Sequence, residues 1–352
     1  MATESSESGA RAGIRDVARA AGVSISTVSN VLNKPEMVAT ATRERVEAIA
    51  RELGYVPNAS ARHLRAGGNR CVGAVFLDLA NPYYTELARG MEDRLAQDDC
   101  LLIVCSSDKD PAREQRYLKM LREQGVQAIL VTPAEDDLRE LEEFGRGTPV
   151  VLLDRPRPST SMCSVHVDDV AGGALATRHL LTQGHRRIAF INGPHSIHAC
   201  ADRAEGMRTA LEGAGLNADE TLVEVTTALL NADGGEAALG PILADKNPPT
   251  AVFCVNDLVA LGVIRGLRRS GVRIPDDVAV IGYDDVEFAS MLATPLTSIR
   301  QPQYQLGRAA AELLLAETAG HTEHQHRDVL FQPELVVRET SRPSRRRTVL
   351  IP

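Results

Sequence analysis

Apolar residues near the amino terminus recur at the spacing of two short helices that pack against each other. The apolar stripe of the first predicted helix consists of Ile14, Val17, Ala18 and Ala21. Gly22 ends this helix, and Ser24 is a suitable N-cap for the next one. The buried face of that second helix consists of Val28, Val31 and Leu32. The pattern therefore predicts a helical pair joined by a tight turn.

The opposite face of the second predicted helix carries short side chains near its amino-terminal end. These residues are Ile25, Ser26, Ser29 and Asn30. In a helix-turn-helix domain, this end of the second helix reaches base edges in the DNA major groove, while the first helix crosses the backbone. A helical hairpin with no ligand is the alternative. We interpret the region as a DNA-binding head, because the segments that follow also suit DNA.

A third amphipathic helix completes the head, which we expect to span residues 11–57. Its shared apolar face consists of Val46, Ile49, Ala50 and Leu53. Gly54 ends this helix, and Pro57 ends the head. Three helices within about 45 residues are enough for a small compact domain.

Residues 58–69 are predicted to be a hinge helix and linker. The segment favours a helix but is too short to be helical alone, and Gly67 and Gly68 form a flexible joint. Leu64 lies between Arg62 and Arg65, and an apolar side chain flanked by cations suits the minor groove. The hinge would then fold only when it meets DNA. An ordinary linker is the alternative.

From Cys71 onward, short apolar runs alternate with amphipathic stretches. The strand-like runs are 72–77, 101–105, 128–131, 150–153, 188–191, 251–255 and 278–281. The helical stretches include 84–96, 112–123, 171–183, 204–214 and 257–270. Such alternation predicts parallel sheets with helices on both faces, and about 270 residues of it suggest two lobes. The expected fold class is α/β: an all-α head followed by a two-lobed, doubly wound parallel-sheet core.

Ligands of such sheets bind at the carboxyl ends of the strands. The stretches that follow strands here are 78–84, 154–155, 192–203, 256–257 and 283–285. Several polar side chains in them suit a small polar ligand. The sequence therefore predicts a ligand site between the lobes.

Charge is distributed unevenly along the chain, whose formal net charge is −8. Residues 11–66 carry nine Arg or Lys against five acidic residues, and residues 342–352 carry four Arg and no acid. A basic head on an acidic body concentrates the attraction for phosphates at one end. We expect residues 1–10 and 342–352 to be disordered.

Other features argue against a membrane, secreted or catalytic protein. The chain has no 18-residue apolar run and no apolar core in a leader, so a cytoplasmic location is expected. Its six cysteines form no Cys-x-x-Cys pair, which suits free, buried thiols. We find no nucleotide-binding loop or nucleophile motif and expect no enzyme activity, cofactor or metal. His321, His324 and His326 could bind a metal, but a solvated loop is the preferred interpretation.

Taken in order, the motifs of this chain resemble the lactose/galactose repressor family of bacterial transcription regulators. The resemblance covers about residues 14–340. The matching stretches are 16–18, 22–24, 27–33, 53–58, 61–65, 81–84, 184–188, 256–257, 260–262, 282–285 and 299–302. It implies a helix-turn-helix head, a hinge helix, a core like periplasmic sugar-binding proteins, and a homodimer or larger assembly.

The resemblance also implies roles for individual residues of the head and hinge. The expected DNA-binding residues are Ile14, Ile25, Ser26, Thr27, Ser29, Asn30, Asn58, Ala61, Arg62, Leu64 and Arg65. Ile25 can contact a thymine methyl group, and Asn30 can make a bidentate contact with adenine. Thr27 and Ser29 suit phosphate contacts. Two identical heads would bind a near-palindromic operator.

In the core, the resemblance implies an effector pocket between the lobes. The expected effector-binding residues are Asn81, Tyr83, Tyr84, Asp154, Arg203, Asn256, Asp284 and Gln301. Each alone is as compatible with a helix cap or a surface position, and Asn256 could be an N-cap. The family often has a stacking aromatic near residues 229–230, where this chain has two leucines. Tyr83, Tyr84 and Phe288 are the candidates to replace it. The resemblance implies a sugar or sugar derivative as the effector, and the missing aromatic leaves a nucleoside, an acid or no ligand at all as open alternatives.

Three expectations about the lobes and the function complete the analysis. The first lobe is expected to comprise residues 70–166 and 299–327, and the second lobe residues 167–298 and 328–341. We expect a transcriptional repressor in which the ligand favours one closure of the lobes and so changes the packing of the hinge helices on DNA. A solute-binding transport protein with the same core is the alternative. It would require a signal peptide and would not carry the basic head.

Overall fold

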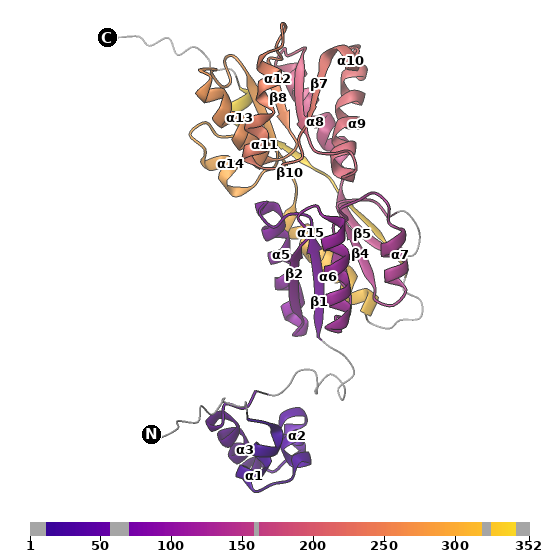
Figure 1. The fold of residues 1–352 in the computed structure, drawn as a ribbon, viewed down its shortest axis with the longest axis vertical. Coiled ribbons are helices and arrows are strands. Elements are labelled where there is room, and N and C mark those ends of the chain that lie inside the picture. Colours follow the sequence, from indigo (N-terminus) through magenta and orange to yellow (C-terminus); the bar gives the residue numbers. More distant parts are fainter. Residues whose placement is uncertain (1–11, 57–69, 158–161, 319–324, 343–352) are drawn as a thin grey trace, which may run out of the picture. The chain divides into compact units, whose positions relative to one another are not determined.

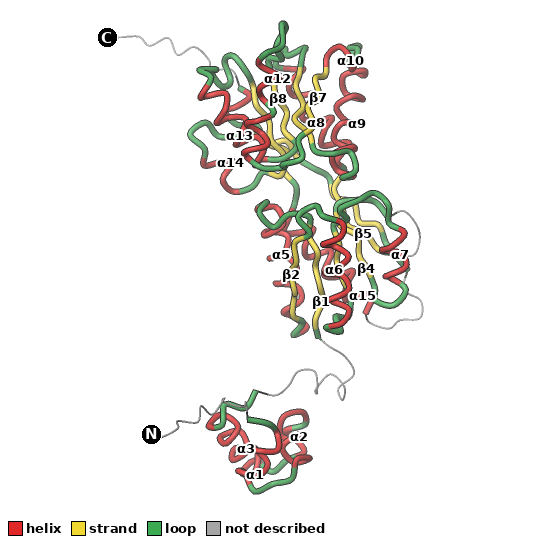
Figure 2. The backbone as a smooth tube through the Cα atoms, in the orientation of Figure 1, coloured by secondary structure: helices red, strands yellow, loops and turns green. Residues whose placement is uncertain are grey.

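The computed structural model describes residues 12–56, 70–157, 162–318 and 325–342. It divides into two compact units, Met1–Asn69 and Arg70–Pro352, which are treated separately below (Figures 1 and 2). The predicted hinge lies outside the described residues, as do the lead-in and nearly all of the basic tail.

The first unit is a three-helix head whose fold follows the apolar pattern of the sequence. Its α-helices are α1 (Ile14–Ala21), α2 (Ile25–Asn33) and α3 (Thr40–Glu52), with a short 3-10 turn η1 (Pro35–Met37). Gly22 takes a left-handed conformation with φ +64° at the end of α1, which favours glycine at the turn. Ser24 Oγ then accepts the backbone N–H of Thr27 and caps α2.

The core of the head joins all three helices. Its buried residues are Val17, Ala18, Ala21, Val28, Val31, Val46 and Ala50, with Ile14, Leu32 and Ile49 packed around them. The predicted faces of α1 and α2 are thus confirmed. The prediction for Leu53 is wrong, because α3 ends at Glu52 and the side chain of Leu53 is exposed.

The first lobe of the second unit is a six-stranded sheet in the order β11-β5-β4-β3-β1-β2, with every pairing parallel. Its strands are β1 (Cys71–Phe76), β2 (Leu101–Ser106), β3 (Ile129–Val131), β4 (Val150–Leu153), β5 (Cys163–Val167) and β11 (Asp328–Phe331). Its helices are α5 (Pro82–Leu95), α6 (Pro111–Glu123), α7 (Arg139–Gly145) and α15 (Gln303–Thr318), with the short turn η2 (Ala96–Asp98).

Helices cover both faces of this sheet. Leu87 of α5 and Leu306 of α15 pack with Ala74 on one face, whereas Leu118 of α6 and Leu141 of α7 pack with Val75 on the other. Neighbouring strand residues therefore point to opposite apolar cores. This explains why β1, β3 and β4 are continuous apolar runs, as in other doubly covered parallel sheets.

The second lobe repeats the plan with the strand order β12-β10-β9-β8-β6-β7. Its strands are β6 (Ile188–Asn192), β7 (Leu222–Thr226), β8 (Ala251–Cys254), β9 (Ala279–Asp284), β10 (Thr297–Arg300) and the antiparallel edge strand β12 (Glu334–Val336). Its helices are α8 (Asp169–Thr182), α9 (His198–Gly213), α10 (Ala218–Thr221), α11 (Ala232–Ala237), α12 (Leu239–Leu243), α13 (Asp257–Arg269) and α14 (Glu287–Met291), followed by η3 (Glu339–Ser341). The predicted two-lobed α/β class is confirmed.

The chain passes between the lobes three times: after β5, after β10 and between β11 and β12. Two expected lobe boundaries are wrong. The first lobe does not resume at residue 299, because β10 pairs with β9 in the second lobe as far as Arg300, and the boundary at residue 327 is wrong by one strand. Residues 328–331 form β11, which pairs with β5 in the first lobe, so the last passage comes at Gln332 and Pro333. Over the described ranges, no helix is long and apolar enough to span a lipid bilayer.

Candidate functional site

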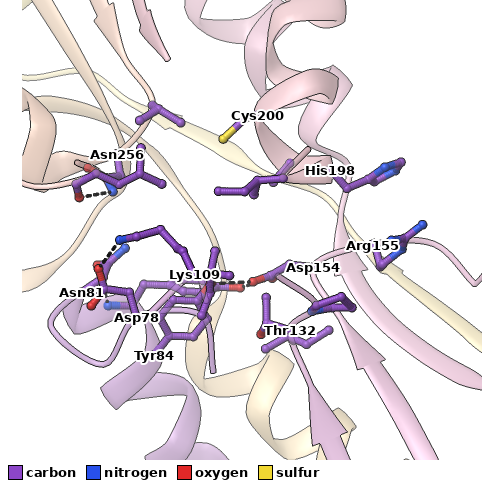
Figure 3. A pocket seen from close by; sticks show the side chains of 18 of the residues that line it. Asp78, Asn81, Tyr84, Lys109, Thr132, Asp154, Arg155, His198, Cys200 and Asn256 are labelled. Carbon is purple, nitrogen blue, oxygen red and sulfur yellow. Dashed lines mark hydrogen bonds and ion pairs between the residues drawn. The ribbon is translucent and has the colours of Figure 1, made fainter. Parts of the chain in front are cut away.

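A cavity lies where the carboxyl ends of strands from both lobes meet (Figure 3). The space among its lining residues amounts to about 740 Å³, part of it open to solvent. The structure brings all eight predicted effector residues to its walls: Asn81, Tyr83, Tyr84, Asp154, Arg203, Asn256, Asp284 and Gln301. The size is typical of a site for a small organic ligand.

Asp154, which directly follows β4, anchors the wall of the first lobe. The hydroxyl of Tyr83 donates to Asp154 Oδ1 at 2.6 Å, and that of Tyr84 donates to Oδ2 at 3.3 Å. Burial raises the pKa of Asp154 to about 7, although the hydrogen bond from Tyr83 opposes this shift. Asp154 is therefore an acceptor that can also carry a proton near neutral pH.

Asp284, at the end of β9, connects the two lobes. Its Oδ2 accepts the side-chain N–H of Asn81 at 2.9 Å, and its Oδ1 accepts that of Gln301 at 2.7 Å. Asn81 also caps α5 by accepting the backbone N–H of Tyr83. Burial raises the pKa of Asp284 to about 6, with Arg203 and these two amides acting in the opposite direction. The hydrogen bond from Asn81 therefore links the two lobes at the wall of the cavity.

Arg203 of α9 is buried in the wall of the second lobe. Its Nε donates to Asp169 Oδ1 at 2.8 Å, Nη1 donates to the carbonyl of Val255 at 2.5 Å, and the guanidinium carbon lies 3.5 Å from the ring centre of Tyr283. Burial by itself would lower the pKa of Arg203, but Asp169 and the other nearby acids raise it well above its usual value. The group therefore stays charged in a fixed orientation.

Close backbone packing sets the position of Arg203. A Cβ atom at Gly173 of α8 would lie only 2.2 Å from the Arg203 carbonyl oxygen. A glycine at this position lets α8 and α9 approach closely, and so places Arg203 next to Asp169 at the start of α8.

The structure supports the simpler interpretation of Asn256 as a cap. Its Oδ1 accepts the backbone N–H of Val259 at the start of α13, and its Nδ2 donates to the carbonyl of Leu230 at 3.1 Å. Both ends of the amide are engaged within the protein. Asn256 still lines the cavity and is 6% exposed.

Six more polar side chains, beyond the eight predicted effector residues, also line the cavity. They are Asp78, Lys109, Thr132, Glu135, Arg155 and His198. Lys109 Nζ pairs with Asp78 at 2.8 Å, and Arg155 pairs with Asp136 at 3.2 Å. Thr132 and Lys109 follow β3 and β2, so the same strand-end rule applied to those two strands would have found them.

Thr132 and Arg155 differ from the rest of the wall. Among the described residues, neither Thr132 Oγ1 nor Arg155 Nε has a hydrogen-bond partner, although both atoms are buried. Buried polar atoms are normally satisfied, so these two atoms stand out as lacking a partner from the described part of the chain.

Two of the three aromatic side chains that were expected near the ligand line the cavity. Tyr83 and Tyr84 line the cavity and lie edge to face, with ring centres 4.9 Å apart. Phe288 is not among the lining residues and instead packs against the core of the first lobe. Leu230 lines the cavity, whereas Leu229 is exposed.

In the head, α2 presents the polar face that the sequence predicts. Ile25, Ser26 and Asn30 are exposed, and Thr27 and Ser29 are half-buried. Ile14 is half-buried and packs against the core of the head, so much of its surface is engaged inside the domain. The expected hinge contacts Asn58, Ala61, Arg62, Leu64 and Arg65 lie outside the described residues.

The fold also determines how deeply the cysteines are buried and where His326 lies. All six cysteines are reduced thiols; Cys105 is half-buried and the others are buried. The expected solvated histidine loop falls mostly outside the described residues, but His326 is described and packs beside Cys163 and Glu317.

The comparison with known protein families gives the class of protein to which this chain belongs. Residues 13–58 match the family described as "Bacterial regulatory proteins, lacI family", and residues 177–341 match the family described as "Periplasmic binding protein-like domain". The combination of a helix-turn-helix head with a two-lobed binding core is that of a DNA-binding transcriptional regulator with an effector site.

Individual relatives span almost the whole chain. The transcriptional repressor PurR of Vibrio atlanticus (strain LGP32) is 37% identical over 334 residues, covering 93% of this chain and 98% of the relative. A solved structure described as the transcriptional regulator CelR–cellobiose complex is 33% identical and has a TM-score of 0.70, covering 94% of this chain and 100% of that one. The Lac repressor dimer bound to operator and the anti-inducer ONPF is 28% identical with a TM-score of 0.80, covering 94% and 99%.

The chain belongs to the lacI family of bacterial regulatory proteins. This confirms the resemblance and replaces the alternative of a solute-binding transport protein, since curated relatives that match almost the whole chain are named as transcriptional regulators. The expected cytoplasmic location follows from membership of this class, because such regulators act on DNA there.

Proposed function

We propose that this regulator is a homodimeric repressor that binds a near-palindromic operator and responds to a sugar or sugar derivative in the cavity between its lobes. It has no catalytic role in this proposal. The observation that carries the proposal is the convergence of eight polar and aromatic side chains on one cavity at the strand ends of both lobes.

The charges in the cavity favour a neutral, hydroxylated ligand over an anion. Each of the cationic side chains Lys109, Arg155 and Arg203 is already paired with a carboxylate, at 2.8 to 3.2 Å. Asp154 and Asp284 add acceptors, which would repel a negative group when ionised. Hydroxyl groups can both donate to carboxylates and accept from guanidinium or threonine groups, so they suit this mixture.

Thr132 and Arg155 give the ligand an orientation. Both are buried and each has an unsatisfied polar atom at the wall of the first lobe. A ligand hydroxyl placed there could donate to Thr132 Oγ1 and accept from Arg155 Nε. The rings of Tyr83 and Tyr84 would supply the nearby apolar surface.

The solved relatives are consistent with this ligand class. One is described as a complex with cellobiose, and a regulator from Enterococcus faecium is described with bound ribose. Several similar sequences, among them two from Vibrio species, are named as the transcriptional repressor PurR. A nucleoside is the competing ligand class in the screen below.

Reading of DNA is assigned to the exposed face of α2. Asn30 can make a bidentate contact with adenine, and Ile25 can pack on a thymine methyl group. Ser26 can contact either kind of base edge, and Thr27 and Ser29 can contact phosphates. The operator-bound Lac repressor is described as a dimer, which supports two heads on two half-sites here.

The proposal is tested with the full chain in two steps. Bound duplexes are selected from a random pool and aligned, and neutral sugars, sugar acids and nucleosides are then screened by thermal shift. We expect a near-palindromic consensus and a stabilising sugar that changes affinity for that duplex. If no duplex is preferred at moderate salt, with or without the screened compounds, the proposal fails.

A further inference from the structure

A second cluster of potential ligands lies in the first lobe, at the end opposite the effector cavity. Cys163 is the first residue of β5, His326 precedes β11, and Glu317 lies near the end of α15. One donor atom from each residue comes together, and all three atoms lie within 4.8 Å of one another. The effector cavity is at the carboxyl ends of these parallel strands, whereas this cluster is at their amino ends.

The separations between the donor atoms are close to those found around a coordinated ion. The distance from Cys163 Sγ to His326 Nδ1 is 3.9 Å, and that from His326 Nδ1 to Glu317 Oε1 is 2.8 Å. Ligands at ordinary zinc distances in a tetrahedron are roughly 3.3 to 3.6 Å apart. These two separations differ from the tetrahedral values by roughly half an ångström, and the third, between Cys163 Sγ and the Glu317 carboxylate, is within 4.8 Å.

The chemical types of the three donor groups indicate which metal ion the cluster would prefer. A thiolate, an imidazole and a carboxylate are the three protein ligands that zinc uses, whereas magnesium and calcium take oxygen ligands almost exclusively. Three protein ligands leave one position of a tetrahedron for water. We propose that Cys163, Glu317 and His326 form a binding site for a divalent transition-metal ion, with zinc as the best match.

The surroundings hold these side chains in place. The backbone N–H of Arg327 donates to Cys163 Sγ at 3.3 Å, and Arg157 Nη1 donates to the carbonyl of His326 at 2.9 Å. Cys163 is fully buried, and the side chain of Glu317 is 8% exposed. Hydrogen bonds around the ligands fix their orientation in metal sites, and a backbone N–H can play that part for the sulfur.

The position of the cluster suggests what a bound ion would do. The three residues belong to β5, to the segment leading into β11 and to α15, so an ion would join an edge strand and a helix to the sheet. Residues 163 and 326 are far apart in sequence, and a link between them stabilises the folded state by mass action of the ion. The expected role is therefore stabilisation of the amino-terminal edge of the first lobe.

The alternative is that the cluster contains only a buried thiol beside a histidine–glutamate ion pair. Metal binding to the full chain distinguishes the two. The protein is stripped with a chelator under reducing conditions and titrated with Co²⁺, Zn²⁺ or Mg²⁺. We expect a thiolate-to-cobalt charge-transfer absorption at one ion per chain, and a rise in the melting temperature with Zn²⁺ but not with Mg²⁺.

Variants then locate the site. Cys163→Ser should abolish the charge-transfer absorption, and His326→Ala, at a half-buried position, should weaken binding at least roughly tenfold while leaving the thiol in place. Cys105→Ser is the matched control, because Cys105 is a thiol of the same lobe outside the cluster. It should behave as the unmodified chain does.

Three results would overturn the proposal. The first is the absence of a charge-transfer absorption in the unmodified chain, and the second is unchanged binding in His326→Ala. The third is binding that persists in Cys163→Ser but disappears in the double variant His321→Ala/His324→Ala, since those imidazoles alone would then hold the ion. If Cys163→Ser does not fold, His326→Ala and the double variant still decide the question.

Discussion

Asn81 Nδ2 donates to Asp284 Oδ2 at 2.9 Å, and this hydrogen bond joins the start of α5 in one lobe to the end of β9 in the other. The two residues are 203 positions apart in the sequence. Both residues line the effector cavity, so a bound ligand either replaces this hydrogen bond or adds further contacts between the lobes beside it. The hydrogen bond is therefore a natural point of coupling between ligand binding and lobe closure.

Asn81→Ala tests this coupling. Loss of one hydrogen bond to a charged group typically costs about 1.5 to 3 kcal/mol, so the balance between closed and open lobes should shift by at least roughly tenfold. We expect the operator affinity in the absence of effector to change, together with the response to effector, as measured by fluorescence anisotropy. The exposed Asn247→Ala in the same core serves as the control. Equal behaviour of the two variants would remove Asn81 from the coupling.

Arg203 is predicted to be essential for the shape of the cavity. Arg203→Ala leaves Asp169 buried without its partner, which typically costs about 3 to 5 kcal/mol of stability. Arg203→Lys keeps the charge but cannot reproduce both the bond to Asp169 and that to the Val255 carbonyl. We therefore expect Arg203→Lys to fold, to retain operator binding and to lose most of its effector response. Urea denaturation and ligand titration measure the two effects separately. An effector affinity in Arg203→Lys equal to that of the unmodified chain would contradict the role assigned to Arg203.

Asp154 should make the stability of the core fall as pH rises. Its pKa is about 7 in the folded state, above the usual value near 4, so the folded state holds a proton that the unfolded state releases between these values. The contribution of Asp154 to the free energy of unfolding is therefore greatest below about pH 4. It decreases as the pH rises to about 7 and is constant at higher pH. The decrease is at most roughly 1.4 kcal/mol for each pH unit between the two pKa values.

Asp154→Asn isolates that contribution, because an amide keeps the size of the group and does not titrate. The difference in unfolding free energy between pH 5 and pH 7.5 should be smaller in the variant than in the unmodified chain. Glu114, whose pKa is raised by its own burial, affects both proteins equally. Identical pH slopes would show that Asp154 does not titrate in this range.

Asn30 should contribute to operator specificity more than to general DNA affinity. We expect Asn30→Ala to weaken binding to the selected duplex by about 1 to 3 kcal/mol and to relax the preference at one base pair of each half-site. Thr40→Ala at the start of α3 is the control in the same head, since this side chain is exposed and uncharged and lies outside α2. A loss that is equal for selected and random duplexes would mean that Asn30 contacts the backbone only.

Local sequence pattern was sufficient for much of the fold. Residue spacing and burial preference predict the faces of α1 and α2, the reduced state of the cysteines and the apolar strands β1, β2, β3, β4, β6, β8 and β9. The pattern does not predict β5, β7, β10, β11 and β12. Polar residues such as Ser164, Glu224 and Asp328 interrupt these strands, and their pairing depends on distant partners.

The candidate cavity was predictable in part for the same reason. Asp154, Asn256 and Asp284 lie at or just after strand ends, where a parallel sheet gathers its ligand groups, and the family resemblance adds Arg203 and Gln301. Thr132 and Lys109 obey the same rule and were missed because two strand ends were not considered. That Thr132 Oγ1 and Arg155 Nε lack partners among the described residues could be seen only in three dimensions.

The sequence by itself determined which faces of the helices and strands are apolar, where most elements begin and end, and which class of protein the chain belongs to. Those properties depend on residues within one or two turns of one another. Only the tertiary structure decided that β11 belongs to the first lobe, that Asn81 reaches Asp284, and that Cys163, Glu317 and His326 meet. The physical reason is that these contacts join residues many positions apart, whose meeting depends on how whole sheets and helices pack and on no local periodicity.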